Sequence, residues 1–232
     1  MKLSASQTQA LEALRGLSLR GLRLTEETWK ESGNDLKIEG RPALFWVVEQ
    51  AIAARGQEDH TRTRALAVLS WLLKVGVSTE GIHKGNTALM EAAGMGDLAC
   101  ARRLLSANAN LAATSPMGST PLHWAAIGGR PTMCKLLISH GASITPKNQD
   151  GRTPLHCAAD RLRMNTIAVL HEAGSDWNVV DVQGRTPLET IAHRDPGLAR
   201  NWKNRPERDR LAQETSEANQ EPIDKPMRSR RL

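Results

Sequence analysis

The sequence predicts an all-α protein built as an array of repeated helix pairs. Three observations lead to this class: a segment recurs at a constant spacing, each copy carries signals for the start and end of helices, and the apolar residues are mostly aliphatic. The 232 residues include six Trp, one Phe and no Tyr, so the core must come mainly from Leu, Ala, Ile, Val and Met. This composition favours helices.

The recurrence begins at a glycine and keeps its period through four copies. Gly85, Gly118, Gly151 and Gly184 are each 33 residues apart. The copies read GNTALMEAA, GSTPLHWAA, GRTPLHCAA and GRTPLETIA, and three of them contain Gly-x-Thr-Pro-Leu. An unbroken period of this length is typical of stacked repeat proteins, in which each unit buries its apolar face against its neighbours.

Each copy predicts two short helices. The threonine of the motif stands where an N-cap belongs, and the proline after it fits the first helical position. Small residues such as Ala125 and Ala126 let neighbouring helices approach closely. A second apolar run at helical spacing follows and ends at Asn108, Gly141 and Gly174, residue types that adopt the left-handed conformation just after a helix.

These motifs resemble the ankyrin repeat. Thr-Pro-Leu-His-x-Ala-Ala stands at residues 120–126 and 153–159, and Leu-Ile-Ser-His-Gly-Ala at 137–142. The resemblance implies an ankyrin-repeat solenoid of about five repeats, made of helix-turn-helix pairs with projecting hairpin loops and degenerate caps. It also implies a structural role for His123 and His156, and protein binding along the inner helices and the hairpin tips.

The chain divides into three predicted parts. Residues 1–37 form an N-terminal helical cap, with short helices at Gln7–Leu14 and Thr25–Glu31, or alternatively a separate recognition arm. Residues 38–202 form the repeat domain, and residues 203–232 a disordered tail with a basic end. The repeat domain comprises a divergent first repeat at 38–81, further repeats at 82–114, 115–147 and 148–180, and a C-terminal cap at 181–202.

The first repeat contains an insertion. Gly40 and Gly76 are 36 residues apart, whereas Gly85 and Asn108, the corresponding positions of the next repeat, are 23 apart, which leaves an excess of 13. The excess falls near the polar residues 53–64 and predicts an enlarged loop with longer flanking helices. This loop is a candidate for a function of its own.

The sequence predicts no catalytic residues, no metal site and no cofactor. His123 and His156 lie one repeat apart, about 8–10 Å, which is too far to share a metal bound at about 2 Å. Cys157 follows His156 directly, but adjacent residues of a helix point about 100° apart. Together with Cys100 and Cys134 it makes an odd number of cysteines, which indicates buried thiols in a reducing compartment. We also expect no small-molecule substrate, because the sequence contains neither a phosphate-binding loop nor a dinucleotide motif.

Partner-binding residues are expected at equivalent positions of successive repeats, where they would form stripes along the groove. The first stripe is the residue directly after each motif glycine: Asn86, Ser119, Arg152 and Arg185. The second stripe is the tenth residue after each motif glycine: Met95, Gly128, Arg161 and Arg194. We expect the four arginines in solvent, where they would attract a partner with an acidic surface, or alternatively form a merely solvated face. Further candidates are Lys84 and Met117 at the tips and Trp124 and Ile127 on the inner face. Trp124 fits equally a binding hot spot or packing between helices.

The predicted function is a non-catalytic protein–protein interaction module, an adaptor or inhibitor, that is monomeric and cytoplasmic. No apolar targeting region or membrane-spanning run occurs, so we expect no membrane insertion. The formal net charge of +6 owes much to the last eight residues, which carry four Lys or Arg and no acid. Three interpretations of this basic end stay open. It is a solvated tail, a patch for nuclear import or for contact with an anionic surface or nucleic acid, or a translocation signal. For the last reading, it resembles the Arg-rich C-terminal signals of bacterial type IV secretion substrates, which would make the protein an effector that captures a host protein.

Overall fold

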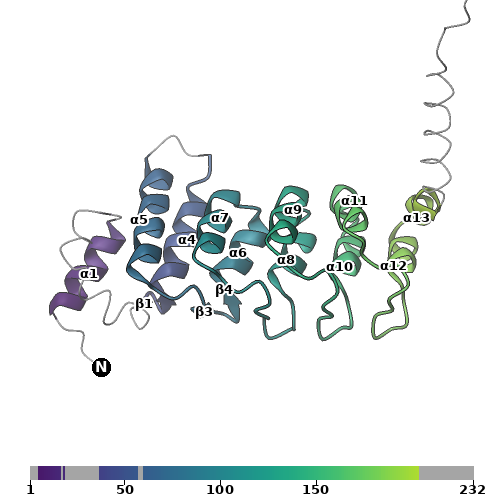
Figure 1. The fold of residues 1–232 in the computed structure, drawn as a ribbon, viewed down its shortest axis with the longest axis horizontal. Coiled ribbons are helices and arrows are strands. Elements are labelled where there is room, and N and C mark those ends of the chain that lie inside the picture. Colours follow the sequence, from purple (N-terminus) through teal and green to yellow (C-terminus); the bar gives the residue numbers. More distant parts are fainter. Residues whose placement is uncertain (1–4, 17, 19–36, 57–59, 204–232) are drawn as a thin grey trace, which may run out of the picture.

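The helices stack in two layers along an elongated array (Figure 1). The computed structural model describes residues 5–16, 18, 37–56 and 60–203. An inner layer is formed by α4 (Ala43–Ala53), α6 (Ala88–Met95), α8 (Pro121–Ile127), α10 (Pro154–Asp160) and α12 (Pro187–Arg194). An outer layer is formed by α5 (Thr61–Val75), α7 (Leu98–Ser106), α9 (Pro131–Ser139), α11 (Met164–Glu172) and α13 (Pro196–Lys203). The predicted all-α solenoid of helix pairs is confirmed.

The helices begin and end at the residues that the motif predicts. Thr87, Thr153 and Thr186 are N-caps whose hydroxyls accept hydrogen bonds from the backbone N–H three residues later, at 3.2–3.5 Å. These bonds satisfy donors that have no partner inside the helix. At the other end, Asn108 (φ 57°) and Gly141 (φ 93°) adopt the left-handed conformation, which lets the chain turn into the next hairpin.

The hairpins project from one edge of the array and link successive repeats (Figure 1). The first two contain short antiparallel pairs: β1 (Lys37–Ile38) with β2 (Arg41–Pro42), and β3 (Ile82–His83) with β4 (Asn86–Thr87). Later hairpins lack such strand pairs and are closed by individual bonds, such as that from Asn148 N–H to the Arg152 carbonyl at 3.0 Å. Successive tips are also joined, since Gln149 N–H donates to the Met117 carbonyl at 3.0 Å. The tips therefore form a connected edge.

The insertion in the first repeat mainly lengthens its helices. Helices α4 and α5 have 11 and 15 residues, against 8 and 9 in α6 and α7. The buried carboxylate of Asp97 caps α7 and lies 2.8 Å from Arg62 and 3.2 Å from Arg55. Burial alone would raise the pKa of Asp97, but the hydrogen bonds from Arg62 and the α7 backbone lower it overall. Charged Asp97 thus anchors both ends of the α4–α5 connection to the second repeat.

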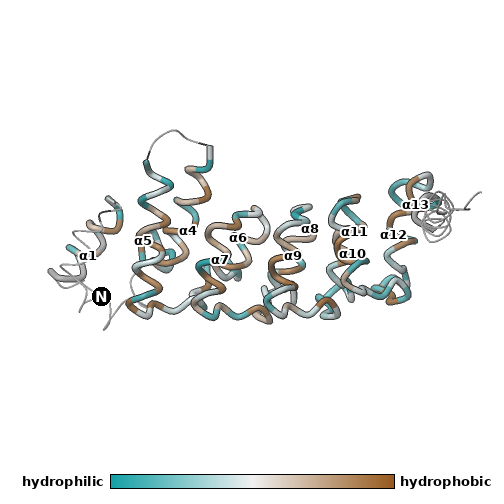
Figure 2. Tube along the Cα trace, turned by 45° about the horizontal axis from the view of Figure 1, so that its top comes forward, coloured by the Kyte–Doolittle hydropathy of each residue, from teal (hydrophilic) through white to brown (hydrophobic). Residues whose placement is uncertain are grey.

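A single apolar core runs between the layers for the whole array. Figure 2 shows apolar segments recurring in successive helix pairs. At the N-terminal end, α1 (Ala5–Arg15) contributes Ala10 and Leu14, both fully buried, to this core. The helix predicted at 25–31 lies outside the described residues, as do 204–232 of the tail. No described helix has the length and apolar character needed to cross a bilayer.

Candidate protein-binding surface

Two buried histidines hold neighbouring repeats together. The Nδ1 atom of His123 lies 2.9 Å from Thr120 Oγ1, and its Nε2 atom lies 3.0 Å from the carbonyl oxygen of Arg152 in the next hairpin. His156 repeats the arrangement with Thr153 and the carbonyl of Arg185. Nδ1 also accepts from the threonine N–H, so each ring is neutral with its proton on Nε2. Both histidines therefore have the structural role that the resemblance implies.

This arrangement predicts that the fold weakens in mild acid. Burial lowers the pKa of His123 and His156 below the ordinary 6.5, so the unfolded chain takes up protons before the folded one. The contribution of the two neutral rings to the free energy of unfolding is complete above about pH 6.5. It is lost as the pH falls toward the pKa of each histidine in the folded protein, at up to about 1.4 kcal/mol per pH unit for each ring. We expect the free energy of unfolding in urea to fall by about 1–2 kcal/mol between pH 6.5 and 5.5. A flat profile, or the same slope in a His123→Met/His156→Met variant, would contradict this.

The cysteines offer no nucleophile. Cys100, Cys134 and Cys157 are buried, and burial raises the pKa of each thiol to about 12. They are protonated at neutral pH and are held inside the core, where they pack as small apolar side chains. Within the described ranges, no three His, Cys, Asp or Glu side chains come together as a metal site.

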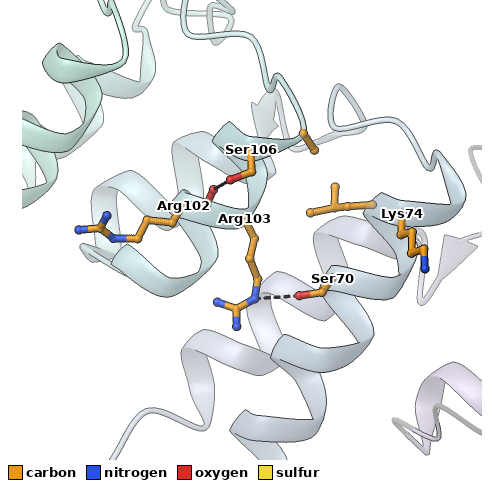
Figure 3. Close-up of a pocket in the computed structure, with 7 residues that line it drawn as sticks. Ser70, Lys74, Arg102, Arg103 and Ser106 are labelled. Carbon is orange, nitrogen blue, oxygen red and sulfur yellow. Dashed lines mark hydrogen bonds between the residues drawn. The ribbon is translucent and has the colours of Figure 1, made fainter.

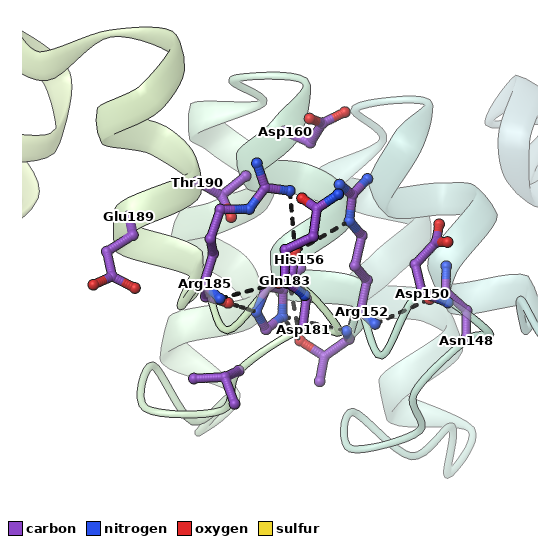
Figure 4. Close-up of polar contacts among 12 residues, drawn as sticks. Asn148, Asp150, Arg152, His156, Asp160, Asp181, Gln183, Arg185, Glu189 and Thr190 are labelled. Carbon is purple, nitrogen blue, oxygen red and sulfur yellow. Dashed lines mark hydrogen bonds and ion pairs between the residues drawn. The ribbon is translucent and has the colours of Figure 1, made fainter.

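The first arginine stripe is paired internally, contrary to the expectation that it lies in solvent. Arg152 Nε and Arg185 Nη2 lie 3.6 and 3.2 Å from Oδ2 of Asp181, which is buried (Figure 4). Only 22% and 28% of the two arginine side chains are exposed. Burial raises the pKa of Asp181, but the N–H groups of Arg185 and Gln183 and the Arg185 guanidinium lower it overall. The charged carboxylate fixes both arginines against the hairpin.

A periodic signal in the sequence points to this carboxylate. Asp181 is in register with Asn148 and Ser115, which lie 33 and 66 residues earlier. Each of the three side chains accepts a hydrogen bond from the backbone N–H four residues later and so closes its hairpin. A polar residue at this position must turn inward. The position lies three residues before the motif glycine, outside both stripes, so the stripes alone do not indicate this partner.

The second arginine stripe is exposed but not free. Arg161 and Arg194 have 61% and 53% of their side chains exposed, and they lie 3.7 and 2.9 Å from the carboxylate of Asp160. The four stripe arginines thus share two aspartates, so they do not form a row of unpaired guanidinium groups. A pocket of about 280 Å³ between the third and fourth motifs is lined by Arg152, Asp160, Gln183, Arg185, Thr190, His193 and Arg194.

The candidates in the N-terminal half separate into exposed and buried groups. Lys84 is exposed, Met95 and Met117 are 45% and 55% exposed, and Asn86 and Ile127 are half-buried. Ser119 of the first stripe is expected to face the partner but is buried, and its N–H donates to the Ser115 hydroxyl at 3.2 Å. That prediction is wrong.

Trp124 packs between helices more than it projects. Its side chain is half-buried against the core, and the ring lies beside Gly94 of the preceding inner helix. The indole Nε1 is buried without a hydrogen-bond partner among the described residues. This placement fits the packing interpretation.

Several apolar side chains outside the predicted stripes are exposed on the hairpins. Ile82 is 60% exposed on β3, and Val180 and Val182 are 45% and 69% exposed on the last hairpin. Together with Met117 they place large apolar groups on three separate hairpins. Their signal in the sequence is an aliphatic residue within four positions of the motif glycine, in segments that are otherwise polar.

A helical repeat array with apolar hairpin tips and inert core thiols defines the class of interaction scaffolds. Sequence profiles for "Ankyrin repeats (3 copies)" and "Ankyrin repeat" match residues 52–148 and 150–182. The chain belongs to the ankyrin-repeat family, whose members generally mediate protein–protein interaction and typically carry no catalytic activity. No curated protein sequence matches the chain significantly.

Proposed function

We propose that this protein is a non-catalytic adaptor or inhibitor that captures a protein partner over its hairpin tips and the adjoining inner face. The observation that carries the proposal is the row of apolar tip side chains, Ile82, Met117 and Val182, each more than half exposed. Exposed apolar groups on a rigid edge are typical of interaction surfaces, where burial of each side chain contributes about 1.5–3 kcal/mol. The exposed arginines Arg161 and Arg194 would add orientation.

The charges along the groove indicate which groups the partner surface would carry. Because Asp160 and Asp181 each accompany two arginines, the C-terminal half of the groove carries a modest positive excess. We propose a partner with an apolar patch for the tips and a few acidic groups beside it. Capture in the cytoplasm by a monomer is the simplest arrangement. Roles for the basic tail in nucleic-acid binding or in translocation of a bacterial effector concern residues outside the described ranges.

The test is partner capture by a tip variant. Ile82→Ser/Met117→Ser/Val182→Ser should lose the partners that wild-type protein retains from lysate, as read by mass spectrometry, because three apolar anchors are removed. The matched control is Asn165→Ser/Glu172→Ser, at two exposed positions of α11. Circular dichroism should show that both variants keep the wild-type fold. Unchanged capture by a folded tip variant would exclude the tips as the binding surface.

A second pair of changes tests the arginines. Arg161→Glu/Arg194→Glu is the milder reversal, because both side chains are more than half exposed and their partner Asp160 is 18% exposed. The same change at Arg152 or Arg185 would place a carboxylate beside buried Asp181 and weaken the fold. Partial loss of the same partner would support the acidic component of the proposal.

A further inference from the structure

The outer layer of the N-terminal repeats carries cations that lack carboxylate partners. Helices α5, α7 and α9 contain no Asp or Glu. Among their basic residues, Lys74 and Arg102 are exposed and make no ion pair within the described residues. This differs from the inner face, where every stripe arginine lies beside an aspartate. Uncompensated positive charge from Lys74 and Arg102 thus lies on the outer layer, whereas the paired stripes lie on the inner face.

These cations surround a pocket between α5 and α7. The pocket has a volume of about 370 Å³ and apolar walls from Leu73 and Ala107. Lys74, Arg102 and Arg103 line it as well, and none of its lining residues is acidic. Its size suits one or two side chains of a partner, because about 300 Å³ is the lower end of specific binding pockets.

The cationic groups are spread around the pocket and do not converge on a single point. Figure 3 shows Lys74 and Arg102 on opposite sides of Arg103. Arg103 is held in place, since its Nε donates to Ser70 Oγ at 2.9 Å and its Nη1 to the Ala99 carbonyl at 2.8 Å. A single small anion could not contact all three groups. A segment with several carboxylates placed around an apolar side chain could.

We propose that the pocket between α5 and α7 is a second docking site, which binds an acidic peptide segment of another protein through one apolar side chain. The apolar side chain enters between Leu73 and Ala107, and its acidic neighbours pair with Lys74, Arg102 and the Nη2 group of Arg103. Charge complementarity excludes the C-terminal segment 225–232 of this chain as the occupant, because that segment is purely basic. The site is independent of the tip surface, so the protein could hold two partners on two faces.

The test uses a defined probe: a fluorescein-labelled peptide with one central Leu between two pairs of Glu. Fluorescence anisotropy in low salt should show saturable binding to the full chain, and Lys74→Glu/Arg102→Glu should weaken it by about ten-fold or more, because two favourable charge contacts become repulsive. The matched control is Arg161→Glu/Arg194→Glu on the inner face, which should bind as wild type. A probe with Ser in place of Leu should bind more weakly. If the Glu variant is unfolded by circular dichroism, Lys74→Gln/Arg102→Gln serves instead.

Amide chemical shifts decide where the probe sits. Perturbations at Ser70, Lys74 and Ser106 support the proposal, whereas perturbations confined to the inner helices or hairpin tips overturn it. Equal binding by the Glu variant also overturns it. Equal affinity for the Leu and Ser probes would show a general anion-binding surface and overturn the peptide assignment. Full displacement of the Leu probe by a DNA duplex, added so that its phosphate concentration equals the carboxylate concentration of the probe, would overturn it in the same way.

Discussion

Replacing His123 by alanine is expected to lower the free energy of unfolding by about 3 kcal/mol. The imidazole is fully buried and bonds to Thr120 on its own helix and to the Arg152 carbonyl in the next repeat. The change removes both bonds and leaves a void at a contact between repeats. Urea unfolding followed by circular dichroism at pH 7.5 measures the loss.

The chain itself supplies the matched control for this change. At the equivalent position of the preceding repeat stands Met90, whose sulfur accepts from Thr87 N–H at 3.5 Å. His123→Met should therefore keep the volume and the bond to the cap but lose the bond to the Arg152 carbonyl. We expect it to cost about 1 kcal/mol, the usual worth of one hydrogen bond. If His123→Ala and His123→Met lower the free energy of unfolding by the same amount, the bond to the Arg152 carbonyl accounts for the whole loss, and the bond to the cap contributes nothing.

The repeat fold could be predicted from sequence because its signals are local. Thr153 followed by Pro154 specifies a helix start within three residues, and Gly141 specifies a stop within one turn. Such signals depend on the backbone of their own segment, so neighbouring repeats do not alter them. Their 33-residue period then implies the stack, since each unit must bury its apolar face on the next.

The binding surface was harder to predict because exposure depends on the neighbouring repeat. Arg152 occupies the same motif position as half-exposed Asn86, yet its side chain is held by Asp181, which belongs to the following hairpin. Ser119 also follows a motif glycine, yet it is buried, and its N–H donates to the Ser115 hydroxyl. Ile82 stands at the same position as Ser115 but is exposed, because the backbone pairing of β3 with β4 closes that hairpin and leaves its side chain outside. Periodicity identifies equivalent positions, but the residues that meet across repeats decide which side chains reach solvent.

Close packing between inner helices leads to the second large expected effect, at Gly128. A Cβ atom at this position would lie 2.2 Å from the carbonyl oxygen of Gly94 in the preceding repeat, a backbone atom that cannot rotate away. Gly128→Ala should therefore push α6 and α8 apart at their C-terminal ends and lower the free energy of unfolding by about 3 kcal/mol. Its φ of −67° is ordinary for alanine, so the cost is steric and not conformational.

Gly141→Ala separates these two causes. Gly141 has a φ of +93° and no atom within 4 Å of the position of a Cβ, so alanine there meets backbone strain without a clash. We expect a loss of about 1 kcal/mol, the cost of a left-handed alanine. Urea unfolding of both variants gives the comparison. A Gly128→Ala loss no larger than that of Gly141→Ala would mean that the inner helices can separate cheaply, and that the 33-residue stack tolerates a wider groove than its structure shows.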